Sequence, residues 1–221
     1  LKVAAQEFNQ DCRYIRNGFS PENLLMANLA RKRESSKPNS NENVNIGYAS
    51  GTATHQADFD VVASTIWQLM LEDPRILLTV VGPLEWNTPP PADVMSRIAM
   101  RPLVPHVNLP FELARFDINI VPLERNAFCD AKSPLKFFEA GLVNVPTLAT
   151  GNPTYEGIGA ISQACLLAND QAAWYDHLRR LISKTGLRME LGGLAREAAI
   201  KNFHCDLSVN SYLQLPKTYN F

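Results

Sequence analysis

The sequence lacks the marks of several protein classes. Its four cysteines, at positions 12, 129, 165 and 205, form no Cys-x-x-Cys pair, which argues against a disulfide framework or zinc site and favours a reducing, cytoplasmic compartment. No apolar run approaches the ~20 residues of a membrane-spanning helix, and no secretory signal opens the chain. Lysine and arginine number 21 against 22 acidic residues, so the basic excess of a nucleic-acid binder is also missing.

Two further features are absent, the common nucleotide-binding motifs and an initiator methionine. The loop after the first apolar run has neither the Gly-Lys-Ser/Thr of a Walker loop nor the Gly-x-Gly-x-x-Gly of a dinucleotide site. The initiator methionine is missing as well, so we expect an excised piece of a longer protein. The 221 residues are 46% hydrophobic and 19% charged, a globular composition with room for one domain and an appendage, or two very small domains.

The first forty residues differ from the rest. A segment from Pro21 to Arg33 has helical apolar spacing and ends in the basic triplet 31–33, which complements a helix C-terminus and favours a helix end over a binding patch. Residues 34–43 are polar without periodicity and are typical of a linker or long loop.

After this linker, short apolar runs alternate with helix-length segments. The expected strands are 44–48, 76–81, 118–121, 147–149 and 164–167. The expected helices are 58–72, 135–142, 155–162, 170–183 and 187–202. This alternation predicts an α/β fold with a Rossmann-like parallel sheet covered by helices on both faces. We divide the chain into an N-terminal helix and linker (1–43), this domain (44–205) and a tail (206–221).

In such a sheet, ligands bind at the carboxyl ends of the strands. The loop after the first strand contains Gly51, whose backbone can approach a ligand closely, together with Thr52 and His55. The sequence leaves open whether this loop contacts a phosphate or is an ordinary strand-to-helix connection.

The strongest local signal follows the strand at 118–121. Ser133 is a good N-cap and Pro134 suits the first helical position, which places Lys136 in the first turn and Lys132 just before it. A cation there opposes the helix dipole by ~0.3–1 kcal/mol. An anion bound between the lysines would reverse that cost, so we favour a diphosphate site over two solvated lysines.

Glu139 lies three residues after Lys136, near the same helix face. A carboxylate one turn beyond a phosphate site is well placed to accept hydrogen bonds from ribose hydroxyls, as an acidic residue does in dinucleotide folds. The alternative is a surface ion pair with Lys136, which would contribute little.

At this point the residues resemble a known family. Residues 117–123 and 132–150 are similar to the donor-binding half of a GT-B glycosyltransferase, in particular the retaining group 1 family. The Arg-Asn-Gly-Phe-Ser stretch at 16–20 resembles the Asn-Gly element at which the chain of those enzymes enters the donor domain. The strand and loop at residues 46–52 are also similar to theirs. The resemblance covers roughly residues 14–203.

The resemblance implies a nucleotide-diphosphate sugar donor, whose glycosyl group passes to an acceptor. Rate-critical diphosphate contacts would come from Lys132 and Lys136, with further substrate contacts from Ser133, Glu139, Gly51, Thr52, His55 and Asp130. The segment 100–104 would contact the base. No cofactor or obligatory metal is implied, and the chain has no Asp-x-Asp.

The chain departs from the family in two ways. The family's motif has a glutamate eight positions before Glu139, where this chain has Ala131 with Asp130 beside it. A complete GT-B enzyme also has two Rossmann-like domains. The resemblance therefore implies that an acceptor domain precedes Leu1, that the tail returns to it, and that any membrane association occurs through that missing half.

Two other functions compete with a donor-binding half. A non-catalytic scaffold module with a decayed nucleotide site is one alternative. A sugar-nucleotide epimerase is the other, but the acid-base candidates His55, His106, Glu124 and Asp130 are too scattered to favour it. His106, between a proline and a valine, is interpreted as a loop residue.

Overall fold

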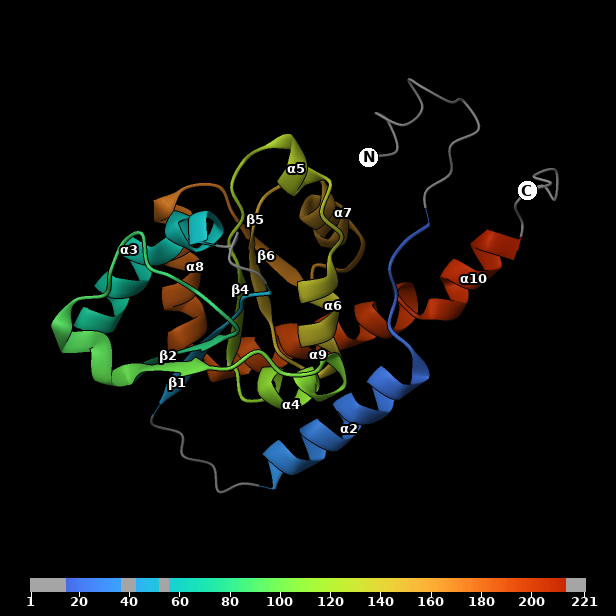
Figure 1. Ribbon diagram of the computed structural model, residues 1–221, viewed down its shortest axis with the longest axis horizontal. Coiled ribbons are helices and arrows are strands. Elements are labelled where there is room, and N and C mark those ends of the chain that lie inside the picture. The colour runs from blue at the N-terminus through green and yellow to red at the C-terminus, as the bar shows by residue number, and fades with distance from the viewer. Residues whose placement is uncertain (1–14, 37–42, 52–55, 214–221) are drawn as a thin grey trace.

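A computed structural model of the chain describes residues 15–36, 43–51 and 56–213. Six parallel strands form one sheet in the order β3-β2-β1-β4-β5-β6 (Figure 1). The strands are β1 (Val44–Ala49), β2 (Ile76–Val81), β3 (Ile98–Arg101), β4 (Ile118–Val121), β5 (Thr147–Thr150) and β6 (Cys165–Ala168). The α-helices are α2 (Pro21–Ser35), α3 (Gln56–Glu72), α4 (Leu109–Leu113), α5 (Ala127–Asp130), α6 (Leu135–Leu142), α7 (Pro153–Ser162), α8 (Gln171–Ser183), α9 (Thr185–Asn202) and α10 (Cys205–Leu213).

The predicted α/β sheet is confirmed, with one strand added. All five expected strands, the expected N-terminal helix and the five helices expected after the linker are present, with ends that shift by at most a few residues. The strand that the sequence did not reveal is β3, which pairs only with β2 at the edge of the sheet. Its four residues are half-buried or exposed, so they lack the apolar run that marks the inner strands.

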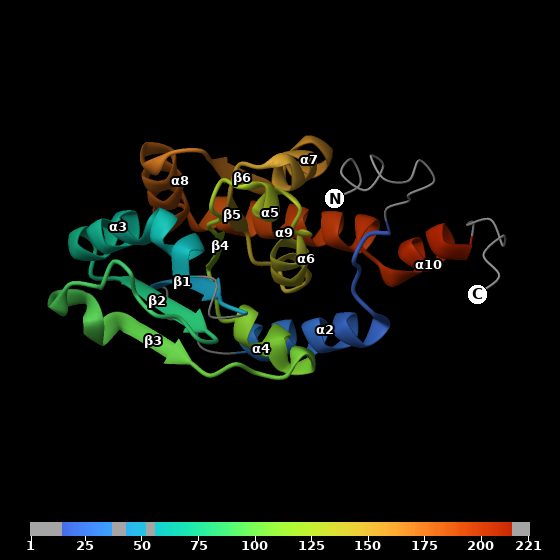
Figure 2. The same cartoon turned by 45° about the horizontal axis from the view of Figure 1, so that its top comes forward.

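Side chains from the sheet enter two hydrophobic clusters. Along β4, Ile118 and Ile120 belong to the cluster shared with α3 and α8, whereas Val121 belongs to the cluster shared with α4, α6 and α9. Successive side chains of a strand point to opposite faces, so the two clusters lie on the two sides of the sheet. Figure 2 shows α3 and α8 on one side and α4 and α6 on the other.

The strand order fixes where a ligand can enter. β1 and β4 are neighbours in the centre, and the chain leaves β1 toward β2 but leaves β4 toward β5. The connections therefore diverge at the carboxyl ends of β1 and β4, which is where open α/β sheets form their binding crevice.

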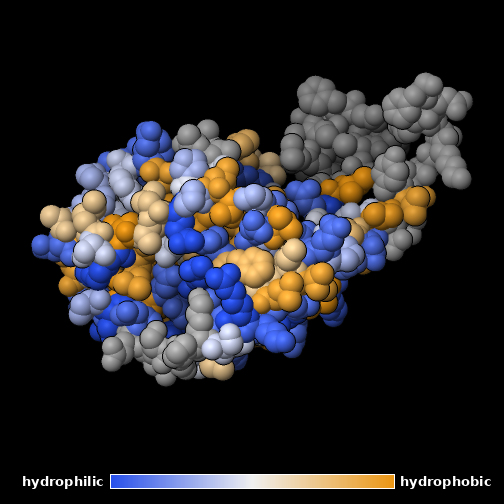
Figure 3. Space-filling view, turned by 60° about the horizontal axis from the view of Figure 1, so that its bottom comes forward, coloured by the Kyte–Doolittle hydropathy of each residue, from blue (hydrophilic) through white to orange (hydrophobic). Residues whose placement is uncertain are grey.

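Helix α2 covers part of the second cluster. The Ser20 hydroxyl caps this helix by accepting a hydrogen bond from the backbone N–H of Asn23. Ala27 and Ala30 are buried with Phe137 of α6. Outward residues such as Leu25 alternate with charged ones, and Figure 3 shows hydrophobic and hydrophilic surface interleaved on the side that α2 and α4 form. In the described part of the chain, every helix is too short or too polar to cross a bilayer.

Two glycines in α9 offer a matched test of how closely this helix approaches the segment that follows α6. A Cβ added at Gly192 would lie 2.0 Å from the backbone oxygen of Asn144, whereas one at Gly193 would meet nothing within 4 Å. We expect Gly192→Ala to lower the free energy of unfolding by about 1–3 kcal/mol through overpacking. Gly193→Ala should leave it unchanged or raise it by up to ~1 kcal/mol, because alanine is the better helix former. Urea denaturation of both variants checks this, and equal effects would contradict the close approach.

Candidate functional site

The candidate site lies at the N-terminus of α6. The predicted helix bounds are confirmed, but the predicted N-cap is wrong: Pro134, with φ −82° and ψ 38°, is the N-cap residue, and its carbonyl oxygen accepts from the amides of Phe137 and Phe138. The Ser133 hydroxyl instead accepts a hydrogen bond from Asn17 Nδ2 at 3.0 Å. Since no side chain among the described residues caps α6, its first amide groups remain available to a ligand.

Lys136 occupies the first turn of α6. Its Nζ atom is buried, has no hydrogen-bond partner among the described residues and lies 4.6 Å from the centre of the Tyr48 ring. Asn119 of β4 donates to the Lys136 backbone oxygen at 3.1 Å, which holds this turn against the sheet. Burial lowers the pKa of Lys136 to about 8, although the charge of Asp58 acts in the opposite direction.

Lys132 has a partner that the sequence did not reveal. Its Nζ donates to the buried carboxylate of Asp58, in the first turn of α3, at 2.8 Å. Asp58 also accepts from the Glu124 amide at 3.0 Å and lies 3.6 Å from Cys129 Sγ. Burial alone would raise the pKa of Asp58, but Lys132 and the Glu124 amide outweigh it and lower the pKa. Asp58 therefore ties the loop after β4 to the helix after β1.

The alternative of two solvated lysines is wrong, since one amine is buried and the other is paired with a buried carboxylate. The site holds two ammonium groups and one carboxylate, which is paired with Lys132. A buried ammonium group without a partner is costly, and an uncapped helix N-terminus attracts anions. The arrangement is suited to an anionic ligand.

Glu139 has a different partner. Its Oε1 lies 3.1 Å from His106 Nε2, and its side chain is only 18% exposed. The alternative of a surface ion pair between Glu139 and Lys136 is therefore wrong. Burial raises the pKa of Glu139, and the hydrogen bond from His106 acts against that rise. His106 does lie in a connecting segment, a short 3-10 helix at His106–Asn108, but it faces the site.

The remaining predicted residues divide into three groups. Gly51 follows β1 and is exposed at the carboxyl end of the sheet. Thr52 and His55 lie outside the described residues. Asp130 ends α5 and is exposed, and its backbone oxygen accepts from the Thr154 hydroxyl at 3.3 Å.

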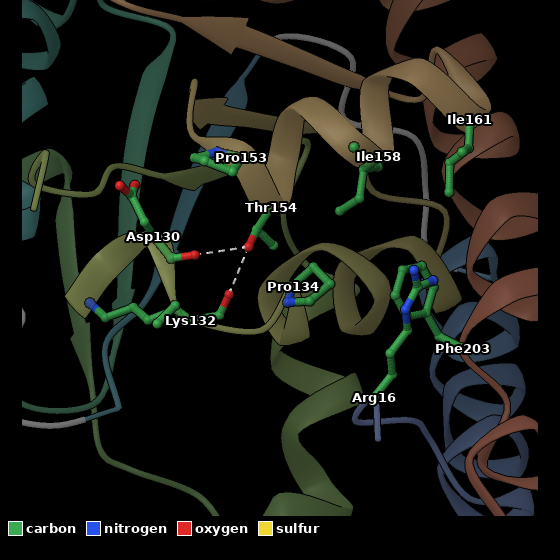
Figure 4. Close-up of a pocket in the computed structure, with 11 residues that line it drawn as sticks. Arg16, Asp130, Lys132, Pro134, Pro153, Thr154, Ile158, Ile161 and Phe203 are labelled. Carbon is green, nitrogen blue, oxygen red and sulfur yellow. Dashed lines mark hydrogen bonds between the residues drawn. The ribbon is translucent and has the colours of Figure 1, made fainter. Parts of the chain in front are cut away.

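Asp130 borders a cavity of about 340 Å³ (Figure 4). It lies between the loop 130–134, the helix α7 and Phe203, and its wall is largely apolar, with Pro134, Ile158 and Ile161 contributing. Figure 4 shows the Lys132 amine pointing away from Ile158 and Phe203. The residues that line the cavity include Lys132 but not Lys136.

Comparison with known proteins places the fold. No protein-family model and no curated protein sequence matches the chain. HepE of Anabaena, solved in complex with UDP, superposes with a TM-score of 0.67 at 13% identity over 91% of this chain and 56% of HepE. A glycosyltransferase of Rickettsia africae gives 0.66 at 13% identity over 96% of this chain and 60% of that one. WaaG, a glycosyltransferase involved in lipopolysaccharide biosynthesis, gives 0.64 at 17% identity over 90% and 55%.

The chain spans less than two thirds of each of these three proteins. Most of the chain superposes on part of each. The predicted fold is confirmed: the chain has the Rossmann-like fold found in one part of GT-B glycosyltransferases.

Proposed function

We propose that the chain binds the nucleoside-diphosphate part of a sugar donor and serves as the donor-binding unit of a glycosyltransferase. One observation carries the proposal: the buried Lys136 amine, in the first turn of α6, has no hydrogen-bond partner among the described residues, and none of their side chains caps that helix. That turn contacts Tyr48 near the carboxyl end of β1 and Asn119 of β4, the two strands at which this sheet topology forms its binding crevice.

The ligand follows from the charges. A diphosphate is compact and carries at least two negative charges, so it matches two ammonium groups and a helix N-terminus. Glu139 lies one turn further along α6 and offers a carboxylate to ribose hydroxyls. The fold shared with HepE, which was solved in complex with UDP, supports a nucleoside diphosphate over inorganic phosphate.

The same groups suit glycosyl transfer. When the glycosyl group leaves, negative charge develops on the departing nucleoside diphosphate, and preorganised cations stabilise that charge. Lys136 and Lys132 would contribute this stabilisation, with Asp58 holding Lys132 in place. The acceptor and the unit that binds it would belong to another part of the protein, which fits the coverage of 55–60% of the similar structures.

Calorimetric titration of the chain with UDP, UMP and uridine tests the proposal, with GDP, ADP, CDP and dTDP to identify the base. We expect saturable binding of one diphosphate. Uridine, which lacks both phosphate groups, should bind at least about 100-fold more weakly than UDP, because each hydrogen bond to a charged group contributes ~1.5–3 kcal/mol. Nucleoside binding as tight as diphosphate binding would contradict the proposal, as would no diphosphate binding at millimolar concentration.

A further inference from the structure

A chain of hydrogen bonds leads from the cap of α2 to Glu139. The Asn23 Oδ1 atom accepts from the backbone amide and the hydroxyl of Ser20, both at 3.0 Å. These two donors fix the orientation of the Asn23 amide, since only its oxygen can accept from them. The NH₂ group of Asn23 must then be the group that lies 3.5 Å from His106 Nδ1.

The Asn23 amide selects the tautomer of His106. An NH₂ group can only donate, so His106 Nδ1 acts as the acceptor and carries no proton in the neutral ring. The proton of the neutral ring is therefore on Nε2, which lies 3.1 Å from Glu139 Oε1 and donates to it. The exposed imidazole of His106 therefore donates a hydrogen bond to the mostly buried carboxylate of Glu139.

This hydrogen bond keeps Glu139 away from Lys136. The two residues are three positions apart on α6, a spacing at which a carboxylate and an ammonium group commonly pair. Among the described residues, Glu139 is hydrogen-bonded to His106, and Lys136 Nζ has no hydrogen-bond partner. With Oε1 engaged by His106, the described part of the chain presents no donor to Glu139 Oε2, which remains available for a ligand hydroxyl.

We propose that Asn23 and His106 are positioning residues that orient Glu139 toward the ribose of the nucleotide, so that the chain distinguishes ribonucleoside from 2′-deoxyribonucleoside diphosphates. This proposal rests on the proposed function. The specificity comes from the carboxylate, which accepts from a 2′-hydroxyl and gains nothing from a 2′-deoxy carbon. Asn23 and His106 act through Glu139 and need no contact with the ligand.

The test compares the dissociation constants of UDP and 2′-deoxyuridine 5′-diphosphate, measured by calorimetry. We expect the unaltered chain to bind UDP about tenfold more tightly or better, since a hydrogen bond to a charged group is at stake. His106→Ala should bring this ratio close to one by weakening UDP alone. His106→Gln should retain most of the ratio because it keeps an N–H donor. Val107→Ala, an exposed neighbour, is the matched control and should leave the ratio unchanged.

The outcomes separate the two proposals. If the unaltered chain binds none of the nucleoside diphosphates titrated above, the proposed function fails; if it binds one other than UDP, that nucleotide and its form with the opposite 2′ group are compared instead. If the unaltered chain binds UDP and its 2′-deoxy analogue equally well, the positioning role is overturned while the diphosphate site stands. The same conclusion follows if His106→Ala leaves the ratio of the two dissociation constants unchanged. Thermal unfolding of His106→Ala shows that the variant is folded, and a loss of ratio in a folded variant supports the proposal.

Discussion

Lys136→Met is expected to weaken UDP binding at least about 100-fold while stabilising the empty chain. The loss of affinity follows because the buried amine is the cation that a diphosphate would pair with inside the site. The gain in stability follows because methionine fills a similar volume without burying a charge. At pH 7 we expect the free energy of unfolding to rise by roughly 1–3 kcal/mol. Calorimetry and urea denaturation measure the two effects.

The pH dependence has a defined sign. The pKa of Lys136 is lowered from 10.5 to about 8 in the folded chain, so between these values the unfolded chain binds more protons. Stability should therefore rise with pH from about 8 to about 10.5, and Lys136→Met should lack this rise. UDP affinity should fall by about tenfold per pH unit above 8, because the empty site loses the proton that the anion requires. Burial would lower the pKa of Lys132, but the hydrogen bond and charge of Asp58 outweigh it and raise the pKa, so Lys132 keeps its proton to higher pH than Lys136 does.

Lys201→Met is the control, since Lys201 is exposed in the last turn of α9. It should change neither UDP affinity nor the pH profile by a measurable amount. A Lys136→Met variant that is less stable than the unaltered chain and binds UDP normally would show that the amine has a structural role and no part in ligand binding.

Asp58→Asn should cost the empty chain about 3–5 kcal/mol of stability. The substitution keeps a group that can accept from the Glu124 amide but leaves the partly exposed Lys132 without its counter-ion, close to the buried ammonium group of Lys136. Because the pKa of Asp58 is lowered, its contribution is present above pH 3.8 and is lost as the pH falls through the folded-state pKa. The variant should therefore lose less stability than the unaltered chain on acidification below pH 3.8.

A bound diphosphate should restore much of this loss, because phosphate oxygens can replace the carboxylate as partners of Lys132. We expect saturating UDP to raise the melting temperature of Asp58→Asn by more than that of the unaltered chain. Asp60→Asn, an exposed position in the same helix, should cost at most about 1 kcal/mol and leave the UDP response unchanged. An Asp58→Asn variant that responds less to UDP than the unaltered chain would contradict a shared site.

The sequence was informative where the signal is local. Apolar runs predicted the inner strands, and the bounds of α6 agree with the structure residue by residue. Lys136 was identified because a cation in the first turn of a helix breaks a local rule. The N-cap was wrong because Ser133 follows a cap pattern, yet Pro134 adopts a ψ of 38° and Ser133 bonds to Asn17, 116 residues away.

Partners distant in sequence could not be predicted. Asp58 looks like an ordinary acidic residue in the first turn of a helix, where it complements the dipole, and nothing local connects it with Lys132, 74 residues away. His106 and Glu139 are likewise 33 residues apart and meet only because α4 and α6 pack together. The burial of the Lys136 amine depends on Tyr48 of β1, which periodicity identifies as a core residue but not as its neighbour.

A crystal structure of the chain with UDP would show whether the diphosphate binds at the first turn of α6. We expect diphosphate oxygens ~2.7–2.9 Å from Lys136 Nζ, with Lys132 beside them and the ribose against Glu139. A nucleotide bound elsewhere, such as in the cavity between α7 and Phe203, with Lys136 Nζ still buried over Tyr48 and without a partner, would contradict it.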